Sequence, residues 1–253
     1  MSENVVIVGA TSGIARALAD VLARRHCRLL LAGRDKQELE ALAADLRVRY
    51  AASVATERFE ALEFDDHPAF WQRCQTHFED AIDGVVVCHG YLPSQAEAQS
   101  NFGEVERTFG INFQSVVSVL NMAAETLAAE TLAARRQGFL AAISSVAGDR
   151  GRASNYIYGA AKAALSTYLD GLRNRLHASG VHVLTIKPGF VDTAMTRGKL
   201  KPSRLVATPE RVARDIDRAL RRQQDVLYTP WFWRPIMAVI RALPERLFKR
   251  LSL

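Results

Sequence analysis

The residues of this chain best suited to chemistry are a tyrosine and a lysine four positions apart, Tyr158 and Lys162. On a helix this spacing places both side chains on one face. A free phenol has a pKa of about 10, and a neighbouring ammonium group is expected to lower it toward neutrality. Ser145, thirteen residues before the tyrosine, can hold a carbonyl oxygen beside the phenol. The pattern predicts acid catalysis at a carbonyl group.

Because ordinary helices also carry tyrosine and lysine at this spacing, the interpretation needs a second feature, a glycine turn near the N-terminus. Residues 5–8 form an apolar run typical of a strand, and a helix is expected to begin near Ile14. Gly9 makes the turn between them, Gly13 allows backbone to approach a pyrophosphate, and the helix N-terminus offers N–H donors. Ala15 replaces the third glycine of the usual fingerprint, where a small residue suffices for packing. The turn predicts a dinucleotide site.

Together these motifs resemble those of the short-chain dehydrogenase/reductase family, over nearly all 253 residues. The resemblance implies reversible hydride transfer between a nicotinamide and a carbonyl or secondary alcohol, with Tyr158 exchanging the proton on oxygen and Ser145 orienting that oxygen. Lys162 is implied to lower the pKa of Tyr158 and to bind the nicotinamide ribose. Asn112 stands where the family completes its catalytic tetrad, and is implied to hold a water that relays protons through Lys162.

Two segments of the implied cofactor site differ from the family pattern. Residues 87–90 read Val-Cys-His-Gly, whereas the family usually has Asn-Asn-Ala-Gly, so backbone contacts to the adenosine ribose can survive but the asparagine cross-links cannot. Glu63 and Phe64 stand where an aspartate and an apolar residue normally read the adenine edge. Residues 187–193 match the Pro-Gly segment that closes over the nicotinamide in the family. The implied cofactor contacts are Gly9, Thr11, Ser12, Gly13, Ile14, Arg34, Glu63, Phe64, Cys88, His89, Gly90, Tyr158, Lys162, Pro188, Gly189, Val191 and Thr193.

The end of the second expected strand bears on the choice between NADP and NAD. NAD-binding relatives place a carboxylate there to bind the ribose 2′-hydroxyl, and this carboxylate would repel a 2′-phosphate. Gly33 occupies that place, and Arg34 follows with a guanidinium group suited to a phosphate. The alternatives are a solvated Arg34 and a register two residues later, with Asp35 as the acidic reader. NADP(H) is favoured, with NAD(H) as the alternative.

Composition and periodicity predict one α/β domain, a Rossmann-type doubly wound parallel sheet with helices on both faces. A chain that is 49% hydrophobic and 24% charged can bury one such core. Apolar runs alternate with helical patterns, and parallel strands require such crossovers. Ligands of these sheets bind at the carboxyl ends of the strands. Strands are expected at residues 5–8, 28–32, 59–64, 85–88, 139–144, 182–187 and 225–228.

Cysteine and histidine usage indicates a cytoplasmic protein without a metal site. Cys27, Cys74 and Cys88 lack metal-ligand spacing and are expected to be reduced thiols. The scattered histidines are interpreted as structural or solvated, with attention to His89 because it lies beside the expected cofactor. No cleavable leader or membrane span is expected. No nucleic-acid partner is expected either, because the sequence holds no nucleic-acid motif or aromatic stacking platform.

Residues 231–253 lie beyond the domain expected at residues 1–230 and read as a basic amphipathic extension. Ile236, Val239, Ile240 and Leu243 share one helix face, and cations line the other. The extension either packs on its own domain or across a homodimer or homotetramer interface, or lies on an anionic membrane at the inner face. The net charge of +6 also suits an acidic partner.

The substrate is the least determined feature. Basic residues in the loop after Thr193 either face a phosphate or are solvated; they are Arg197, Lys199, Lys201 and Arg204. Residues 144–150, this loop and residues 228–230 with the basic tail resemble the reductases of polyprenyl-phosphoryl 2-keto-ribose, which act after a separate FAD-dependent oxidase. A carbonyl reductase of unassigned substrate is the broader expectation. The alternative from another class is a non-catalytic NADP-binding sensor or scaffold.

Overall fold

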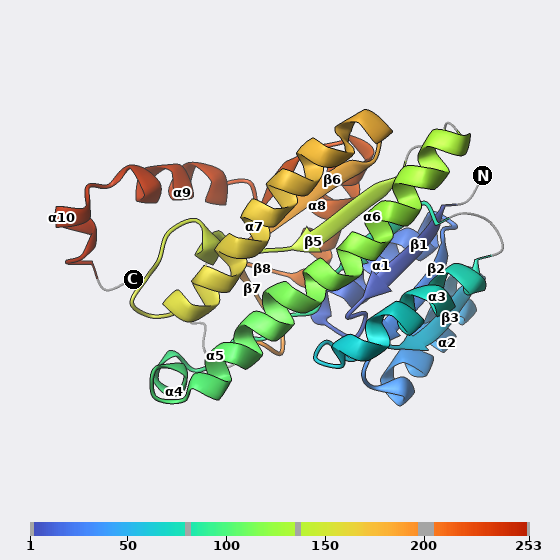
Figure 1. Cartoon of the computed structure of the whole chain (residues 1–253), viewed down its shortest axis with the longest axis horizontal. Helices are drawn as coiled ribbons and strands as arrows, with labels where there is room; N and C mark the ends of the chain where they lie inside the picture. The colour runs from blue at the N-terminus through green and yellow to red at the C-terminus, as the bar shows by residue number, and fades with distance from the viewer. Residues whose placement is uncertain (1–2, 79–81, 135–137, 197–204, 252–253) are drawn as a thin grey trace.

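The core of the protein is a seven-stranded sheet in the order β3-β2-β1-β4-β5-β6-β9, with every neighbouring pair parallel. The computed structural model describes residues 3–78, 82–134, 138–196 and 205–251 (Figure 1). This sheet confirms the expected α/β class. Its strands are β1 (Asn4–Val8), β2 (Arg28–Gly33), β3 (Val54–Arg58), β4 (Gly84–Val87), β5 (Phe139–Ile143), β6 (His182–Pro188) and β9 (Val226–Thr229).

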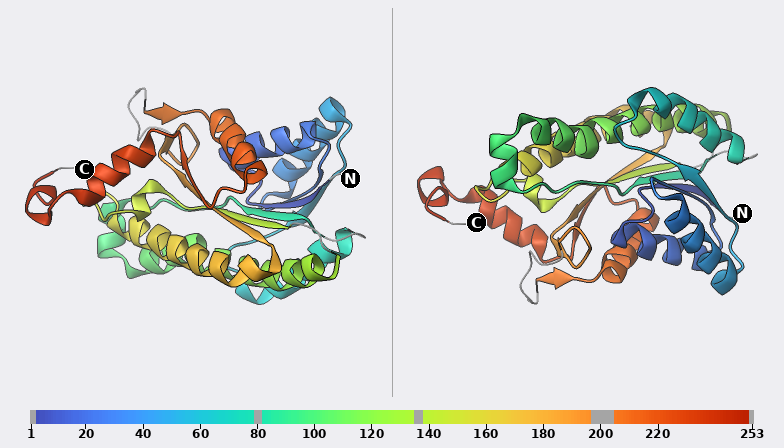
Figure 2. Two further views of the ribbon diagram at one scale, coloured as in Figure 1. Left: turned by 90° about the horizontal axis from the view of Figure 1, so that it is seen from above. Right: turned by 90° about the horizontal axis from the view of Figure 1, so that it is seen from below.

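Helices cover both faces of the sheet, as Figure 2 shows from two sides. One layer holds α1 (Gly13–Arg24), α2 (Lys36–Tyr50) and α8 (Pro209–Arg221), and the other holds α3 (His67–His77), α6 (Ser115–Ala134) and α7 (Tyr156–Leu176). Strand residues alternate between the layers, so that Val5 and Ile7 of β1 pack with the first while Val6 and Val8 pack with the second. Each face of the sheet therefore has its own core.

Shorter elements complete the described chain. Helices α4 (Gln95–Ser100) and α5 (Phe102–Phe109) lead through a π-helical turn at Gly110–Gln114 into α6. Single turns of 3-10 helix lie at Phe64–Asp66, Val146–Gly148 and His177–Ser179. A two-stranded sheet pairs β7 (Phe190–Val191) with β8 (Val206–Ala207). The chain then ends in α9 (Trp233–Ala242) and α10 (Glu245–Phe248).

The prediction of a third strand at residues 59–64 was wrong. The strand is Val54–Arg58, paired with β2 from Leu29 opposite Val54 to Gly33 opposite Arg58. As an edge strand it is polar and partly exposed, so its hydrophobic signal is weak. Phe59, which suggested the strand, is buried after its end against the rings of His67 and Phe70. The other six strands lie within one residue of the predicted bounds.

The chain order changes direction between β1 and β4, which are neighbours in the sheet. Crossovers from β1 run to one side and those from β4 to the other, so the loops after these strands part and leave room for a ligand. Gly9 leaves β1 at a φ of 79°, and a Cβ on it would lie 2.5 Å from the backbone nitrogen of His89. Only glycine allows the two loops to approach this closely.

The C-terminal helices extend from one end of the molecule, away from the N-terminus (Figures 1 and 2). One side of α9 is nevertheless packed, because Trp233 and Met237 form a small core with Val146. A Cβ on Gly189 would lie 1.9 Å from the indole nitrogen of Trp233, which shows how closely α9 meets the loop after β6. The extension is thus attached to the loops that surround the candidate site.

Candidate active site

A pocket of about 250 Å³ lies at the carboxyl ends of the central strands. Its walls come from residues 11–14 after β1, 88–90 after β4, 143–147 at the end of β5 and 188–196 after β6, together with the start of α7. The pocket therefore stands where a doubly wound sheet binds its ligand. It brings Ser145, Tyr158 and Lys162 together with the glycine turn.

Tyr158 lies in the first turn of α7, with the Lys162 ammonium 5.8 Å from the centre of its ring. Burial raises the pKa of the Tyr158 phenol to about 12, and the Ser145 hydroxyl offsets this rise only in part. The expectation that Lys162 lowers this pKa was wrong for the arrangement seen here. The Nζ atom of Lys162 donates instead to the carbonyl oxygen of Ile143, 2.8 Å away.

Lys162 is a buried cation, with only 2% of its surface exposed. Desolvation lowers its pKa to about 7, because a charged ammonium loses water in the pocket without gaining a carboxylate. Cys88 lies near enough to raise this pKa slightly through charge, but burial dominates. Lys162 can therefore gain or lose a proton near neutral pH.

The two serines after β5 have different surroundings. Ser144 is buried, and its hydroxyl contacts α7 at the Lys162 carbonyl oxygen (3.0 Å) and the Ser166 hydroxyl (2.8 Å). Ser145 is partly exposed, and its oxygen accepts a hydrogen bond from the Ala147 N–H at 3.1 Å. The Ser145 hydroxyl also interacts with the Tyr158 phenol, whose pKa it lowers in part, so the two hydroxyl groups lie together in the pocket.

Asn112 lies in the π-helical turn and is completely buried. Its side-chain amide donates to the carbonyl oxygens of Tyr91 (2.7 Å) and Thr108 (2.9 Å), and its oxygen accepts from the Tyr91 N–H (3.1 Å). A Cβ on Gly90 would lie 3.1 Å from that oxygen and 3.7 Å from Lys162 Nζ, so both groups flank Gly90. The amide holds the loop after β4 in place, with both donors in use.

The glycine turn presents the N-terminus of α1 to the pocket. Ser12 caps this helix, and its hydroxyl accepts from the Ala15 N–H at 3.4 Å. A Cβ on Gly13 would meet the Thr193 methyl group at 3.2 Å, so the segment expected at the nicotinamide lies against the turn expected at the pyrophosphate. These close backbone approaches and free N–H donors fit a dinucleotide. The pocket lining includes Thr11, Ser12, Gly13, Ile14, Pro188, Gly189, Val191 and Thr193.

Cys88, His89 and Gly90 line the same pocket from the loop after β4. His89 Nε2 lies 2.8 Å from the Ser115 hydroxyl, and its ring lies 5.4 Å from that of Phe59. Burial lowers the pKa of His89 to about 3, so the imidazole is neutral near physiological pH. Desolvation also raises the pKa of the Cys88 thiol to about 12, which leaves that thiol protonated.

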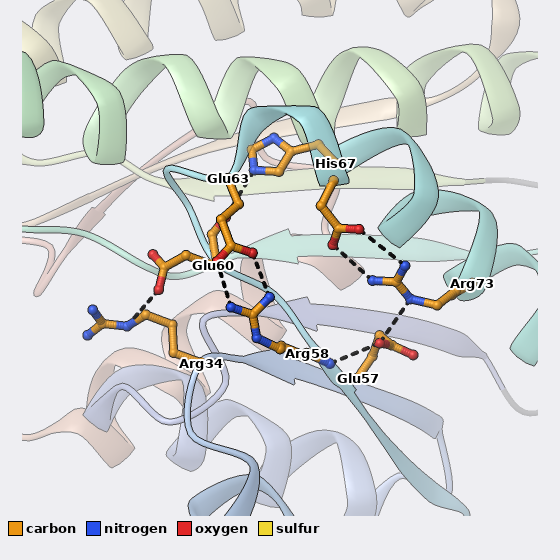
Figure 3. Close-up of polar contacts among 8 residues, drawn as sticks. Arg34, Glu57, Arg58, Glu60, Glu63, His67 and Arg73 are labelled. Atoms are coloured by element: carbon orange, nitrogen blue, oxygen red, sulfur yellow. Dashed lines mark hydrogen bonds and ion pairs between the residues drawn. The ribbon is translucent and has the colours of Figure 1, made fainter.

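Arg34, Glu63 and Phe64 are not among the residues that line the pocket. Arg34 and Glu63 lie near the ends of β2 and β3 (Figure 3). Arg34 is largely exposed, with its Nε 3.9 Å from Glu60. Glu63 binds Arg58 at 2.6 and 2.7 Å, and this hydrogen bonding lowers the pKa of its carboxyl. Arg58 was missed by the motif analysis, because its place beside Gly33 depends on the register of the edge strand.

The two remaining side chains of this region have local partners. Asp35 caps α2, and its carboxylate accepts a hydrogen bond from the Glu38 N–H at 3.0 Å. The residue considered as a ligand of the ribose 2′-hydroxyl of NAD therefore has a structural role. The Phe64 ring packs edge-on against His67, 5.3 Å away, and stays 39% exposed.

Several lining residues had no sequence motif to indicate them. Arg152 and Asn155 come from the loop that joins β5 to α7, and Leu92 comes from the loop after β4. For Arg152 and Asn155 the available signal was their position in the chain between Ser145 and Tyr158. The loop residues Arg197, Lys199, Lys201 and Arg204, expected near the substrate, lie outside the described residues.

Comparison with known proteins identifies the class that this fold and pocket define. The family model for short chain dehydrogenases matches residues 3–203. An uncharacterized oxidoreductase of Mycobacterium tuberculosis is 37% identical over 248 residues, covering 98% of this chain and 96% of that protein. Another from Streptomyces coelicolor is 33% identical over 251 residues, with coverage of 98% and 96%. The chain belongs to the short-chain dehydrogenase/reductase family of oxidoreductases.

Solved structures agree with this fold. A short-chain dehydrogenase from Sphingobium yanoikuyae, in complex with NADPH, superposes with a TM-score of 0.79 at 25% identity, covering 96% of this chain and 97% of the other. A short-chain dehydrogenase from Burkholderia cenocepacia, in complex with NADP, has a TM-score of 0.82 at 18% identity over the full length of both chains. At 18% identity, the similarity to the Burkholderia cenocepacia structure shows a shared fold and nothing further.

Proposed function

We propose that this protein is an NADP(H)-dependent oxidoreductase that reduces a carbonyl group or oxidises the corresponding secondary alcohol. The observation that carries the proposal is the pocket itself. It joins a hydroxyl group (Ser145), a phenol (Tyr158) and a buried ammonium (Lys162) to a glycine turn at a helix N-terminus. A proton donor, an oxygen-orienting group and a dinucleotide cradle are the parts that carbonyl reduction requires.

The nicotinamide cofactor, when bound, supplies or accepts the hydride. The residues of the chain bind the substrate oxygen and exchange a proton with it. Tyr158 is protonated at neutral pH because burial raises its pKa to about 12, so the phenol is ready to donate its proton during reduction. The Ser145 hydroxyl, which already accepts a bond from Ala147, can donate its own hydrogen to the same oxygen. The reverse reaction needs the phenolate and is therefore favoured at high pH.

Lys162 and Asn112 support this proton transfer. Since the pKa of Lys162 lies at about 7, the ammonium can replace a proton that leaves the tyrosine. Both side chains flank Gly90, which keeps the loop after β4 against the start of α7. In the proposed relay Asn112 holds a water through the remaining lone pair of its oxygen, because both amide hydrogens are bonded to the protein.

Two arginines support a preference for NADP(H). Arg34 and Arg58 lie at adjacent ends of β2 and β3, where the 2′-phosphate of NADP would meet them (Figure 3). The carboxylate of Asp35 is engaged at the N-terminus of α2. The NADPH complex of the Sphingobium relative is consistent with this choice. Glu63 and Phe64 remain proposed contacts to the adenine edge.

The proposal is tested by binding and turnover together. NADPH and NADH are titrated by calorimetry, and oxidation of each is followed at 340 nm with ketones, aldehydes and keto-sugars. We expect tighter binding of NADPH and measurable turnover of at least one carbonyl. NADPH binding without turnover across the set would instead identify a non-catalytic sensor or scaffold.

A narrower substrate, a keto-sugar on a lipid phosphate with an FAD-dependent oxidase as partner, stays a prediction. Its support is the basic, partly apolar surface of the C-terminal helices, where Trp231 is 71% exposed and Val239 63%. Such a surface suits peripheral contact with an anionic membrane. Among the helices of the described residues, none is long and apolar enough to cross a membrane. The homodimer or homotetramer and the cytoplasmic location also stay predictions.

A further inference from the structure

Arg152 is a cation in the wall of the pocket, and its Nε atom has no hydrogen-bond partner in the part of the chain that the structure describes. It lies on the loop between Ser145 and α7 and is partly buried. Its Nε atom is buried without a hydrogen bond, and among the described residues no carboxylate forms an ion pair with its guanidinium group. A desolvated charge without a counterion is unfavourable, so an anionic group of a ligand would stabilise this arginine.

The nearest acidic residue cannot supply that counterion. Asp149 is 2% exposed and binds Lys187 at 2.6 Å through one carboxylate oxygen and the Tyr228 hydroxyl at 2.8 Å through the other. Its charge raises the pKa of Arg152, but burial outweighs this effect and the net direction is downward. The neighbouring Arg150 is different, because its guanidinium group donates to the carbonyl oxygens of α9 and to Glu245.

A second polar group, from Asn155, also has no hydrogen-bond partner among the described residues. The side-chain oxygen of Asn155 is buried and accepts no hydrogen bond, and Asn155 lines the same pocket. The two residues belong to one turn, in which the Asn155 N–H donates to the Arg152 carbonyl oxygen at 3.1 Å. Together they offer a charged donor six residues before Tyr158 and a neutral acceptor three residues before it.

We propose that Arg152 binds an anionic group of the substrate, a carboxylate or a phosphate, while Asn155 accepts a hydrogen bond from a substrate hydroxyl. The planar guanidinium fork suits either anion. This inference rests on the proposed function for the position of the reacting carbonyl at Tyr158. The substrate class is thus a carbonyl compound that carries a negative charge on the side away from the cofactor.

The cofactor pyrophosphate is a different anion with its own place. The N-terminus of α1 offers the backbone N–H groups of its first turn and the positive end of the helix dipole to the pocket, whereas the Ser12 N–H is bonded to the Gly9 carbonyl oxygen. Arg152 instead belongs to the loop that carries Ser145 and leads into Tyr158. Measuring NADPH affinity in an Arg152 variant therefore distinguishes an arginine that binds the substrate anion from one that binds the cofactor pyrophosphate.

The test compares matched substrate pairs that differ in charge. The pairs are 4-formylbenzoate with its methyl ester, and dihydroxyacetone phosphate with dihydroxyacetone. For each pair we divide kcat/KM of the anionic substrate by kcat/KM of the neutral one. In Arg152→Gln we expect this ratio to fall about tenfold or more, mainly because KM for the anionic substrate rises. Arg152→Lys should recover part of the ratio. The matched control is Arg218→Gln on the exposed face of α8, which removes one charge far from the pocket.

An unchanged ratio in Arg152→Gln overturns the inference. So does a loss of NADPH affinity equal to the loss of the ratio, because Arg152 would then bind the cofactor. The carboxylate and phosphate pairs distinguish the two anions, and a fall in either ratio supports the proposal.

A binding readout keeps this inference separate from the proposed function. Benzoate and benzamide are titrated into the NADPH-loaded protein, and binding is followed by calorimetry at low salt. Benzoate binding that is lost in Arg152→Gln supports the anion site even if no carbonyl compound is turned over, in which case the proposed function alone fails. Equal binding of benzoate to both proteins, or none to wild type at 10 mM, overturns the anion site.

Discussion

Burial sets the proton chemistry of Tyr158 and Lys162, the two titratable residues of α7 that line the pocket. It raises the pKa of the Tyr158 phenol to about 12 and lowers that of the Lys162 ammonium to about 7, so both are driven toward their neutral forms. The absence of a carboxylate partner for Lys162 among the described residues makes this possible. In the proposed reaction, the protonated phenol is the form that donates a proton to the substrate oxygen during reduction.

Replacing Tyr158 by phenylalanine tests the proton donor. Tyr158→Phe removes the hydroxyl but keeps the ring, so we expect turnover to be lost while NADPH affinity stays within a few-fold of wild type. Stopped-flow or steady-state oxidation of NADPH and calorimetric titration measure the two quantities. Retention of more than a tenth of wild-type turnover would show that another group donates the proton.

The pH dependence of stability tests the buried ammonium. In the unfolded chain Lys162 keeps its proton up to about pH 10.5, whereas in the fold it loses the proton near pH 7. The unfolded state thus binds more protons between these values, and wild-type stability should rise with pH there relative to Lys162→Met. The slope should approach about 1.4 kcal/mol per pH unit.

Urea denaturation of the cofactor-free proteins between pH 6 and 9.5 measures this difference. The upper limit avoids the titration of Tyr158, whose raised pKa acts in the opposite direction above pH 10. Lys36→Met, at an exposed position on α2, is the matched control and should show no such trend. A constant difference between wild type and Lys162→Met would mean that the ammonium stays charged in the fold.

At the scale of elements, the loop between β5 and α7 contacts both the candidate active site and the C-terminal helices. Ser145 stands at one end of it, and Arg150 donates to the carbonyl oxygens of Ile240 (2.5 Å) and Leu243 (2.7 Å) at the end of α9. The guanidinium group also lies 3.7 Å from the centre of the Phe248 ring. A cation at a helix C-terminus satisfies free carbonyls and the negative end of the dipole.

Arg150→Met should therefore release α9 and α10 from the domain. We expect faster amide hydrogen exchange in residues 233–248 and a loss of stability of about 1.5–3 kcal/mol, because charged hydrogen bonds are removed. Arg246→Met, an exposed cation of α10, is the control. Unchanged exchange in α9 would show that the packing of Trp233 and Met237 alone holds the helix.

The two arginines at the adjacent ends of β2 and β3 are expected to determine the preference for NADPH over NADH. Arg34→Ala should weaken NADPH by roughly ten- to a hundredfold and NADH much less, because a charge-assisted bond to the 2′-phosphate is lost. Arg58→Ala should add to this discrimination if the second arginine shares the phosphate. Calorimetric titration of both cofactors measures it, and equal losses for NADPH and NADH would place the 2′-phosphate elsewhere.

At the scale of the whole molecule, the C-terminal helices have one packed side and one exposed side. Trp233 and Met237 are buried on the domain, whereas Val239, Leu247 and Trp231 are exposed. Cations accompany these exposed groups along α9 and α10. The packed side shows that the extension contacts its own domain, and contact of the exposed side with an anionic surface stays a prediction.

We expect the full-length protein to co-sediment with vesicles that contain anionic lipid and not with neutral ones. A variant with Arg246, Lys249 and Arg250 all replaced by Gln should lose this binding while staying folded, because these cations are exposed. Truncation at Pro230 is a poorer test, since it also removes the side chain of Trp233 from Gly189. Absence of vesicle binding by the folded protein would leave only the packing role.

The sequence by itself determined the fold class and most of the strands, because alternating apolar runs and a glycine turn are local signals. Six strands fell within one residue of prediction, but the polar edge strand Val54–Arg58 carries little apolar signal and was misplaced. Motif spacing was likewise enough to select Ser145, Tyr158 and Lys162, which the fold brings to one pocket.

Only the tertiary structure decided the electrostatics of the site and the identity of its remaining walls. Spacing suggested that Lys162 lowers the pKa of Tyr158, yet desolvation, which depends on everything packed around α7, acts in the opposite direction. Arg58 and Arg152 carry no motif, and their roles depend on strand register and on which neighbours are already paired. Such contacts join residues far apart in the chain, so no local pattern in the sequence records them.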